Sequence, residues 1–449
     1  MSALLLGIDG YDSPNAGCTT HFTVFLLKHL FSNLRDLSLR EPPHLVRLNP
    51  NAPWRTRGNA SIALHLDLPS GENTIKKLLD TAKEAASKYS WAVGENKGTI
   101  IIMEDSDENG RELAVWMYRK AVKDILPRQI AKKLLHQSGA HLYSIGDKSI
   151  VGSLAAIGFT LSKKRWTYEL LAYRKIGSLG KRRVDDESVR KAEERFPTLF
   201  NNYDYIKRKN IASPSGPDPV LIGLRGIHAP DLLKAMNYIK IDETISNYCV
   251  FLTNQHTDAH DASRTVRSFR LYQTGSIEGV VTEKPRILNG GHVSIRVSDD
   301  TGTLRIIFYR ETRPLNLIAS KLERGDYIRV LGSLTSDAEG FVLNGEKIWA
   351  RETAPHARWL KPICPKCGSR MKSAGKNKGY KCPKCGYRLR EDDAVKEIRI
   401  EKRVFSKTAY TPYNGRLRHL ISPPILNNIR ETSVLPPRHQ WCASTPHFN

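Results

Sequence analysis

The sequence predicts a multidomain α+β protein whose C-terminal half holds an OB-fold β-barrel followed by a zinc ribbon. Three observations predict this class. The chain has 449 residues, which is too long for one core and should divide into roughly three or four domains. Short β-branched runs with one helix follow one another across residues 275–350. Two CPxCG knuckles come next, beginning at Cys364 and Cys382.

The charge balance favours a polyanionic partner. Lys and Arg number 70 against 46 Asp and Glu, so the formal net charge is +24. Such an excess raises the local concentration of nucleic acid, which we favour over merely solvated basic faces. No run reaches the ~20 apolar residues that a membrane span needs, and the run at 3–6 lacks the basic flank and cleavage site of a signal peptide. We expect a cytoplasmic protein with no membrane contact and no obligate protein partner.

The first informative loop, GIDGYDSPNAGCTT at 7–20, lies between an apolar run and a helical pattern. Asp9 and Asp12 flank a tight turn, so both carboxylates can face one point, as two ligands of Mg²⁺ would. Thr19 and Thr20 stand where the helix begins, and free N–H groups there attract phosphate. The alternative makes Ser13 and Thr20 N-caps and the aspartates turn formers.

A second loop, NPNAPWRTRGN at 49–59, follows a predicted strand at 45–48. Its two prolines stiffen it, and Arg47, Arg55 and Arg57 offer paired donors to phosphate oxygens. Gly58 lets the backbone approach a ligand closely. The chain has no Walker A or G-x-G-x-x-G sequence, so these two loops must be judged by their own residues. On that basis we expect them together to hold a nucleotide with its metal.

The OB-fold prediction rests on the order of its elements. Apolar runs at 276–281, 292–297 and 304–309 precede a helical segment that ends at Gly325, and runs at 327–331 and 341–350 follow it. Three strands, a helix and two strands is the order of an OB barrel. Such barrels commonly bind single-stranded nucleic acid through basic and aromatic side chains, although another ligand or a structural role is the alternative. The candidates are Arg286, Arg296, Arg305, Tyr309 and Arg310.

The knuckles predict a closed zinc site. Cys364, Cys367, Cys382 and Cys385 can offer four thiolates in a tetrahedron, which leaves no open position for catalysis; a rubredoxin-like iron site is the competing interpretation. The loop between the knuckles is basic, and we expect it to contact RNA. Its candidates are Lys372, Lys376, Lys378 and Tyr380.

The cysteines indicate a reducing compartment. The knuckles suit a metal site in a reducing compartment and not a disulfide framework; Cys18, Cys249 and Cys442 are left over, with Cys249 as a small buried apolar residue. After about Arg390 the chain is polar and rich in proline, and we predict that it is mobile until RNA binds.

Taken in order, the motifs resemble one known family. GIDxxDS-x3-GCTT and VRLNPNxPWRTRGN are similar to the archaeal tRNA(Ile) 2-agmatinylcytidine synthetases, and the likeness runs nearly end to end. The OB-fold domain and ribbon follow in the family's order. Further matching stretches lie at 152–158, 167–174, 184–185, 187–189, 200–204, 218–221, 223–226, 253–260 and 418–420.

The resemblance implies an ATP-dependent ligase that attaches agmatine to C2 of the wobble cytidine of the CAU-anticodon isoleucine tRNA. It also implies a kinase-like ATP-binding catalytic domain, a ferredoxin-like agmatine-binding domain that can interleave with it, and a tail that contacts the tRNA or the catalytic domain. The expected bounds are 1–125 for the kinase-like domain, 126–270 for the ferredoxin-like domain, 275–350 for the OB-fold domain, 358–392 for the zinc ribbon and 393–449 for the tail.

In the family, the cytidine oxygen is phosphorylated first and the agmatine amine then displaces it, while a threonine matching Thr19 becomes phosphorylated. The resemblance therefore implies ATP, Mg²⁺ and structural Zn²⁺, with catalysis by Asp9, Asp12, Thr19 and Thr20. The ATP and phosphate candidates are Gly7, Ser13, Gly17, Asn51, Arg55, Arg57, Gly58 and Asn59. The agmatine candidates are Tyr168, Glu169, Tyr203, Asp204 and Asp218, and the further tRNA candidates are Arg418 and His419.

Two departures from the family pattern keep alternatives open. Gly10-Tyr11 stands where the family more often has Asp-Thr, and Ala16 replaces a frequent glycine. A tRNA-binding protein of the same family with a decayed ATP site is the first alternative to an active ligase. A nucleic-acid kinase or ligase that acts on DNA is the second.

Overall fold

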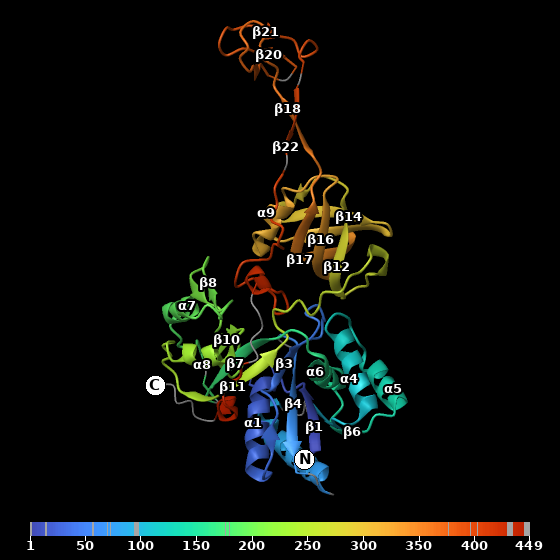
Figure 1. Ribbon diagram of the computed structural model, residues 1–449, viewed down its shortest axis with the longest axis vertical. Helices are drawn as coiled ribbons and strands as arrows, with labels where there is room; N and C mark the ends of the chain where they lie inside the picture. The colour runs from blue at the N-terminus through green and yellow to red at the C-terminus, as the bar shows by residue number, and fades with distance from the viewer. Residues whose placement is uncertain are drawn as a thin grey trace.

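The computed structural model describes residues 2–13, 16–55, 58–69, 71, 73–93, 98–175, 177–178, 180–375, 377–395, 397–401, 403–428 and 434–443. The molecule is elongated (Figure 1), with the N-terminal half at one end, the OB-fold domain in the middle and the ribbon at the far end. Because the ribbon stands on a narrow stalk, it lies well away from the N-terminal half.

One sheet runs through the whole N-terminal half. Its main path is β10-β7-β11-β3-β4-β1-β5-β6, with β2 paired to β4 and β23 paired to β11. The pairs along this path are antiparallel except that of β11 with β3, which joins Leu252 and Thr253 to His44 and Leu45. The bounds are β1 Ser2–Asp9, β2 Ser38–Leu39, β3 His44–Arg47, β4 Ala60–Leu68, β5 Thr99–Glu104, β6 Leu142–Ile145, β7 Thr167–Arg174, β10 Val220–Gly226, β11 Ile245–Thr253 and β23 Cys442–Ala443.

Helices cover both faces of this sheet. Successive residues of a strand face opposite ways, so Leu4 and Leu6 of β1 pack on the side of α1 and α2, while Leu5 packs on the side of α4, α5 and α6. Gly7 allows α6 to lie close to β1, because a Cβ there would come 2.0 Å from the Ser153 carbonyl oxygen. The bounds are α1 Thr19–Asn33, α2 Thr74–Lys88, α3 Ser90–Val93, α4 Glu108–Ala121, α5 Arg128–Ser138 and α6 Ile150–Ser162.

The strands β7, β10 and β11 carry a second group of helices. Tyr168, Leu170 and Ala172 of β7 pack in the same core cluster as residues of α7 and α8, whereas Leu171 and Tyr173 belong to the cluster on the α1 side. Glu169 therefore faces the α1 side of the sheet. The bounds are α7 Asp186–Arg195 and α8 Ala229–Met236, and a small hairpin pairs β8 Tyr203–Asp204 with β9 Lys209–Asn210.

The OB-fold domain contains the five predicted strands and the helix in the predicted order, with one further short strand, β13, after the first. Its sheet runs β12-β16-β17-β15-β14-β13, and β12 also pairs with β14, so the pairings lead back to the first strand. The helix α9 lies between β15 and β16, as expected for an OB-fold domain. The bounds are β12 Thr274–Val281, β13 Arg286–Ile287, β14 Val293–Asp299, β15 Gly302–Phe308, α9 Leu315–Ala319, β16 Tyr327–Asp337 and β17 Gly340–Glu352.

The ribbon is raised on a two-stranded stalk formed by β18 His356–Leu360 and β22 Glu397–Glu401 (Figure 1). The ribbon itself contains a small three-stranded sheet. Its strands are β19 Lys372–Ser373, β20 Tyr380–Lys381 and β21 Arg388–Leu389.

Parts of the C-terminal segment, which the sequence predicts to be mobile until RNA binds, pack back onto the body of the molecule. Leu420 and Ile421 are buried, Trp441 is part of the core on the α1 side, and β23 extends the large sheet. Cys249 is buried as expected, but it forms a disulfide with Cys442, although the cysteine pattern predicts no disulfide framework. Pattern reasoning missed this because β11 and β23 lie far apart in the sequence.

In the part of the chain that the structure describes, none of the helices has the length and apolar character that crossing a bilayer requires.

Candidate active site

The first loop folds tightly onto the N-terminus of α1. Gly10 takes a φ of 80°, which favours glycine, and turns the chain after β1. The Thr19 N–H then donates to the Asp12 carboxylate at 3.0 Å, and the Tyr11 N–H donates to the Thr19 hydroxyl at 3.2 Å. Asp12 thus caps the helix start, and this fixes where its carboxylate lies relative to both threonines.

Tyr11 shows how the loop keeps its shape without the more frequent Asp-Thr pair. Its ring stacks on Phe22 with 3.6 Å between centroids and is almost fully buried. Gly98 makes room for it, since a Cβ there would come 2.4 Å from the Tyr11 ring. The aromatic ring is thus built into the core beneath the loop.

Ser13 holds the middle of the loop together. Its hydroxyl accepts the N–H groups of Ala16 and Gly17 at 3.1 and 2.7 Å and donates to the Ala92 carbonyl at 2.7 Å. These amides are therefore used inside the loop. Ser13 and Gly17, expected to contact phosphate, act in this structure as loop-closing residues.

The surroundings of Asp9 disfavour the ionised form of its carboxyl group. Burial raises its pKa to about 7, and the negative charge of Asp12 adds to that effect, although the Gly10 N–H donates to it at 2.7 Å. The carboxylate lies against the first turn of α6, where a Cβ at Gly152 would come 1.9 Å from Oδ2. Two interacting carboxylates of which one resists ionisation fit a site for a divalent cation, which would relieve the repulsion.

A cavity of about 190 Å³ lies beside this loop. It joins the N-terminus of α1 to the ends of β3, β7 and β10 and to the C-terminal segment. The side chains that can bind or react there come from residues far apart in the sequence. They are Asp12, Cys18, Thr19, Thr20, Arg47, Glu169, Asp218, Arg225 and His419, and the backbone of Gly58 also lines the cavity.

Glu169 lies between two arginines. Its carboxylate oxygens are 3.6 Å from Arg47 Nη2 and 3.3 Å from Arg225 Nε, and it accepts a hydrogen bond from the Gln255 amide. Nε of Arg47 is buried without a hydrogen-bond partner among the described residues, and Nε of Arg225, although close to Glu169, makes no hydrogen bond with it. The pair of guanidinium groups therefore exceeds what Glu169 neutralises and suits an anionic ligand.

Asp218 is also paired within the protein. Its carboxylate accepts the Val220 N–H at 3.1 Å and lies 3.5 Å from Arg182 Nη2. Glu169 and Asp218 thus line the cavity as expected for agmatine ligands, but both already carry ion pairs. Binding a cationic amine would require them to share their charge with these arginines.

His419, expected to contact tRNA, lies instead in the cavity lining. Its Nδ1 is 3.0 Å from the Gln255 amide oxygen. The pKa of His419 lies well below its usual range because Arg47 repels the charged form, with burial, Arg225 and His256 adding to the effect. The imidazole is therefore neutral near pH 7.

Sequence reasoning missed Arg225 and Gln255. Both fall in stretches that match the family, GLRG at 223–226 and TNQH at 253–256, but the match does not indicate what their side chains contact. The signal that could have found Arg225 is an arginine near the end of an apolar strand, where a carboxylate from a neighbouring strand can meet it. Nothing in the local pattern around Gln255 indicates a partner.

Three of the agmatine candidates lie elsewhere. Tyr168 points to the opposite face of the sheet from Glu169 and packs in the core there, because neighbours along a strand alternate. Tyr203 is buried outside the cavity lining, with its ring against Tyr205. Asp204 accepts the N–H groups of Ile206 and Lys207, both at 3.0 Å, and lines a different cleft.

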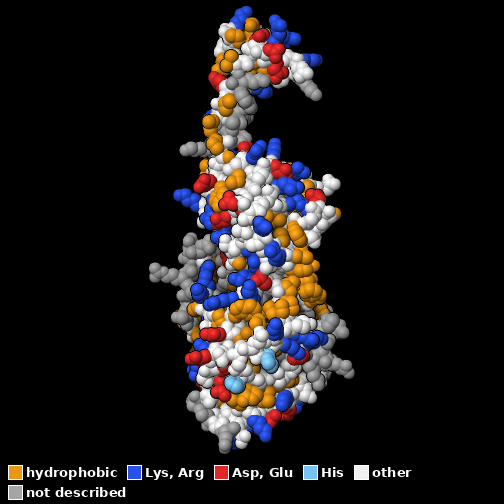
Figure 2. Space-filling model, turned by 90° about the vertical axis from the view of Figure 1, so that its right-hand side faces the viewer, with side chains coloured by type: hydrophobic (Ala, Val, Ile, Leu, Met, Phe, Trp, Pro, Cys, Tyr) orange, Lys and Arg blue, Asp and Glu red, His pale blue; other side chains and the backbone are white. Residues whose placement is uncertain are grey.

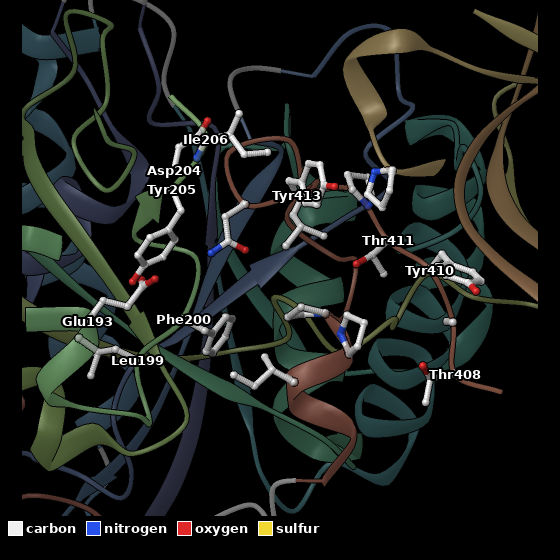
Figure 3. Close-up of a pocket in the computed structure, with 18 of the residues that line it drawn as sticks. Glu193, Leu199, Phe200, Asp204, Tyr205, Ile206, Thr408, Tyr410, Thr411 and Tyr413 are labelled. Atoms are coloured by element: carbon white, nitrogen blue, oxygen red, sulfur yellow. The ribbon is translucent and has the colours of Figure 1, made fainter. Parts of the chain in front are cut away.

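That second cleft has about 700 Å³ and opens between the 193–206 region and the C-terminal segment 408–425. Figure 3 shows that aromatic side chains, among them Phe200, Tyr205 and Tyr413, surround it, with Tyr205 pointing toward Glu193. None of the aspartates and threonines of the first loop lines it. It is larger than the cavity beside that loop but holds none of the loop's chemistry.

The remaining nucleotide candidates divide. Gly58 lines the cavity, and Arg55 is exposed and donates to the Ala52 carbonyl at 2.9 Å. Asn51 donates to the Leu334 carbonyl of the OB-fold domain at 2.9 Å, and Asn59 donates to the Asn49 carbonyl at 2.9 Å. In this structure Asn51 and Asn59 donate hydrogen bonds to backbone carbonyls, and Gly7 packs beneath α6. Arg57 lies outside the described residues.

The RNA candidates also divide. Arg286, Arg296 and Arg310 are exposed, and Tyr309 is 38% exposed with its hydroxyl on Asn344. Figure 2 shows Lys and Arg side chains scattered over this part of the molecule among acidic and apolar ones.

Arg305 and Arg418 have protein partners. Arg305 is buried between Asp337 and Glu339, and Arg418 donates to Glu346 at 2.5 Å, so neither is a simple phosphate contact. Burial raises the pKa of Glu346, but Arg418 and His260 outweigh it and bring it to about 2.

The ribbon gathers its four cysteines as predicted. The sulfur atoms of Cys364, Cys367, Cys382 and Cys385 all lie within 4.8 Å of one another, with 3.6 Å from Cys364 to Cys385 and 3.4 Å from Cys367 to Cys382. Zn–S bonds of ≈ 2.3 Å in a tetrahedron place sulfurs roughly 3.8 Å apart, so the cluster fits a zinc ion. Lys372 and Lys378 are exposed, Tyr380 packs against this cluster, and Lys376 lies outside the described residues.

An α/β unit with a charged cavity, an OB-fold domain and a zinc ribbon together define a multidomain α/β protein equipped to handle nucleic acid. Family models match the chain in the same order. They are the TiaS TCKD domain at residues 5–147, the TiaS FLD domain at 147–260, an OB-fold nucleic acid binding domain at 276–350 and the TiaS C-terminal zinc ribbon domain at 361–403.

Individual relatives agree. The tRNA(Ile) 2-agmatinylcytidine synthetase TiaS of Saccharolobus islandicus is 40% identical over 388 residues, which cover 84% of this chain and 83% of that protein. Crystal structures of TiaS with its isoleucine tRNA and ATP, and with the tRNA, AMPCPP and agmatine, each have a TM-score of 0.78, with 28% and 26% identity, and cover 97% of this chain and 100% of theirs. The chain belongs to the TiaS family of tRNA(Ile) 2-agmatinylcytidine synthetases.

Proposed function

We propose that this protein is an active ATP-dependent ligase that attaches agmatine to C2 of the wobble cytidine of the CAU-anticodon isoleucine tRNA. The observation that carries the proposal is the cavity beside the first loop. It brings Asp12, Thr19 and Thr20 together with the guanidinium groups of Arg47 and Arg225, as a site for a phosphoryl group needs. Relatives of this chain have been crystallised with isoleucine tRNA, ATP and agmatine, which supports the same partners here.

The reaction is proposed in two steps. ATP first phosphorylates the cytidine C2 oxygen, which makes a poor leaving group into a good one, and the agmatine amine then displaces it. Arg47 and Arg225 neutralise the transferred phosphoryl group, since their buried N–H groups are not all used within the protein. Thr19, at the N-terminus of α1, is the proposed site of phosphorylation on the protein.

Asp9 and Asp12 are the proposed ligands of Mg²⁺, which would supply charge neutralisation for the ATP phosphates. Their mutual repulsion, which helps to raise the pKa of Asp9, is the observation that fits a cation there. The four ribbon thiols would hold a structural Zn²⁺. Of the agmatine candidates, Glu169 and Asp218 remain in the proposal because both line the cavity.

The domain assignment belongs to the same proposal. A kinase-like part at 1–125 and a ferredoxin-like part at 126–270 would share the large sheet, and the closed OB barrel at 275–350 and the ribbon at 358–392 would hold the tRNA. The segment 393–449 would contact the catalytic domain through His419 and the ferredoxin-like part through β23. A cytoplasmic location follows from the tRNA substrate.

The test is to incubate the protein with ATP, Mg²⁺, agmatine and a transcript of the CAU-anticodon tRNA and to analyse the nucleosides by mass spectrometry. We expect 2-agmatinylcytidine from the wild type and a loss of at least about 100-fold in rate for Asp12→Asn, since the carboxylate is lost where charge must be balanced. Arg286→Ala is the matched control. It removes an exposed charge of the OB-fold domain, so any effect that it has should come from tRNA binding alone.

The two alternatives predict other outcomes. A protein that binds the tRNA but forms no product has a decayed ATP site. A protein that phosphorylates or joins DNA in preference to the folded tRNA is a nucleic-acid kinase or ligase of another kind.

A further inference from the structure

Three side chains from distant segments form a chain of hydrogen bonds that ends in the cavity. Glu169 lies on β7, Gln255 follows β11, and His419 belongs to the C-terminal segment. The Gln255 Nε2 group donates to the Glu169 carboxylate, and its amide oxygen lies 3.0 Å from His419 Nδ1. Each link restricts the next, because a carboxylate held by two arginines can only accept a hydrogen bond.

This chain fixes the tautomer of His419. Since Glu169 takes the NH₂ end of the Gln255 amide, the oxygen end must face His419, and a carbonyl oxygen only accepts. Nδ1 must therefore carry the proton, and Nε2 must carry the lone pair. A histidine whose second ring nitrogen is held in this way is ready to take a proton at the first.

Nε2, the nitrogen with the lone pair, lies on the cavity side of the ring. A Cβ added to Gly58 would come 3.2 Å from Nε2, and Gly58 and His419 both line the cavity with Asp12 and Thr19. The backbone of the histidine is fixed as well, because its carbonyl accepts the His256 N–H at 2.7 Å and the next carbonyl, of Leu420, accepts the Asp258 N–H at 2.8 Å. The ring is thus held in place before any ligand binds.

The charged groups around the ring keep it neutral. Arg47 on β3 and Arg225 on β10 are the cations that lower its pKa, and His256 adds to them, while Glu169 on β7 and Asp12 on the first loop are the carboxylates that line the same cavity. The carboxylates that line the cavity are all engaged: Asp12 accepts the Thr19 N–H, Glu169 lies between two arginines, and Asp218 accepts from Val220. His419 therefore offers the cavity an uncharged nitrogen that can accept a proton.

We propose that His419 is the general base of the reaction, with Gln255 and Glu169 as the residues that position it. This inference rests on the proposed function, in which an amine replaces an oxygen on a carbon of the RNA base. The amine lone pair forms the N–C bond, the C–O bond breaks with its electron pair on the departing oxygen, and one N–H proton passes to Nε2. A nitrogen that has just bonded to this carbon is far more acidic than a free ammonium, so a weak base suffices.

The first experiment measures single-turnover incorporation of agmatine by His419→Ala. We expect a 10²–10⁴-fold slower rate, as for the loss of a general base. Added imidazole should restore part of the rate, and among substituted imidazoles the rescue should increase with their basicity. A role in packing alone would show no such dependence. His141→Ala, which removes an exposed histidine, is the control and should react at the wild-type rate.

The second variant guards against a packing effect. His419→Gln keeps a side chain of similar length that can donate to Gln255, but it has no basic nitrogen. We expect it to be as slow as His419→Ala while ATP-dependent phosphate transfer to the tRNA or to the protein stays within about threefold of wild type, because that step does not need this base. A His419→Gln protein that incorporates agmatine at the wild-type rate overturns the inference.

The outcomes separate the inference from the function on which it rests. If the wild type forms no 2-agmatinylcytidine, the proposed function fails and the inference falls with it. If the wild type forms the product and His419→Ala reacts equally fast, or is slow without any rescue while phosphate transfer is lost as well, only the assignment of His419 as the base is wrong.

Discussion

The zinc ribbon and the cavity beside the first loop differ in how far apart their parts lie in the sequence. The ribbon takes all four thiols from residues 364 to 385, whereas the cavity takes side chains from Asp12 to His419. Short spacing lets four ligands meet with little help from the rest of the fold, but the cavity forms only when a sheet of the whole N-terminal half and a returning C-terminal segment are in place. The two sites should therefore fail independently, and each in its own way.

The largest effect is expected from a change that disrupts the zinc ribbon and leaves the cavity intact. Cys382→Ser removes one of four thiolates, and because binding of structural zinc is worth about 10–16 kcal/mol in peptides, the ribbon should lose its metal and its fold. Elemental analysis should show zinc falling from one ion per chain to nearly none, while ATP binding measured by calorimetry stays unchanged. Retention of zinc in this variant would refute the four-thiolate site, and loss of ATP binding would refute the independence of the two sites.

A second prediction concerns the cavity and its pH dependence. The pKa of Asp9 is raised from 3.8 to about 7 by burial and by Asp12, so its favourable contribution to folding is complete below about pH 4 and is lost as the pH rises through 7. Asp9→Asn should match the wild type near pH 4 and be more stable at pH 8, by up to about 4 kcal/mol. Urea unfolding at several pH values measures this difference.

Asp80→Asn, an exposed change on α2, serves as the control and should leave the pH dependence of the unfolding free energy as it is. Mg²⁺ should narrow the difference at pH 8 by stabilising the wild type only. A wild type that gains no stability from Mg²⁺ would contradict the proposed metal ligands.

A third prediction sharpens the link between the cavity and the OB-fold domain. Arg418→Ala leaves Glu346 buried without its main cation, and a hydrogen bond to a charged group is worth about 1.5–3 kcal/mol. The free energy of unfolding at pH 7 should fall by about that amount, with no change in bound zinc. If Arg418→Ala and the double variant Arg418→Ala/Glu346→Gln are equally stable, the pair contributes little and the segment is held by its apolar contacts.

The smallest effect is expected at the ribbon surface. Lys378→Ala removes an exposed cation, so tRNA affinity should weaken only a few-fold and the slope of log affinity against log salt should fall by about one if this lysine contacts a phosphate. Lys83→Ala, an exposed lysine on α2, should change neither quantity. Equal effects of the two changes would mean that the ribbon makes no specific contact with the backbone of the tRNA.

The same contrast explains what could be predicted from the sequence. The ribbon and the strand order of the OB-fold domain are carried by spacing and by turn residues, and both were found. The shared sheet was not, because the pairing of β11 with β3 joins residues about two hundred positions apart and a strand pattern shows which face is buried but not which strand is the neighbour.

The site shows the limit more sharply. Tyr168 and Glu169 could have been separated from the sequence, since adjacent residues of a strand face opposite ways. The positions of Arg225, Gln255 and His419 could not, because their roles depend on contacts among β7, β10, β11 and the C-terminal segment. Likewise, the role of Ser13 depends on the folded loop, in which its hydroxyl accepts the Gly17 N–H.

The return of the C-terminal segment to the sheet has a consequence for biosynthesis. The first loop lies near one end of the sequence, whereas His419 and β23 lie hundreds of residues later and are therefore synthesised later. A ribosome-bound or prematurely terminated chain would therefore carry Asp12 and Thr19 without His419, which lines the same cavity. Under the proposed mechanism, such unfinished copies would lack the base for the attachment of agmatine, so the order of synthesis would protect the tRNA from incomplete enzyme.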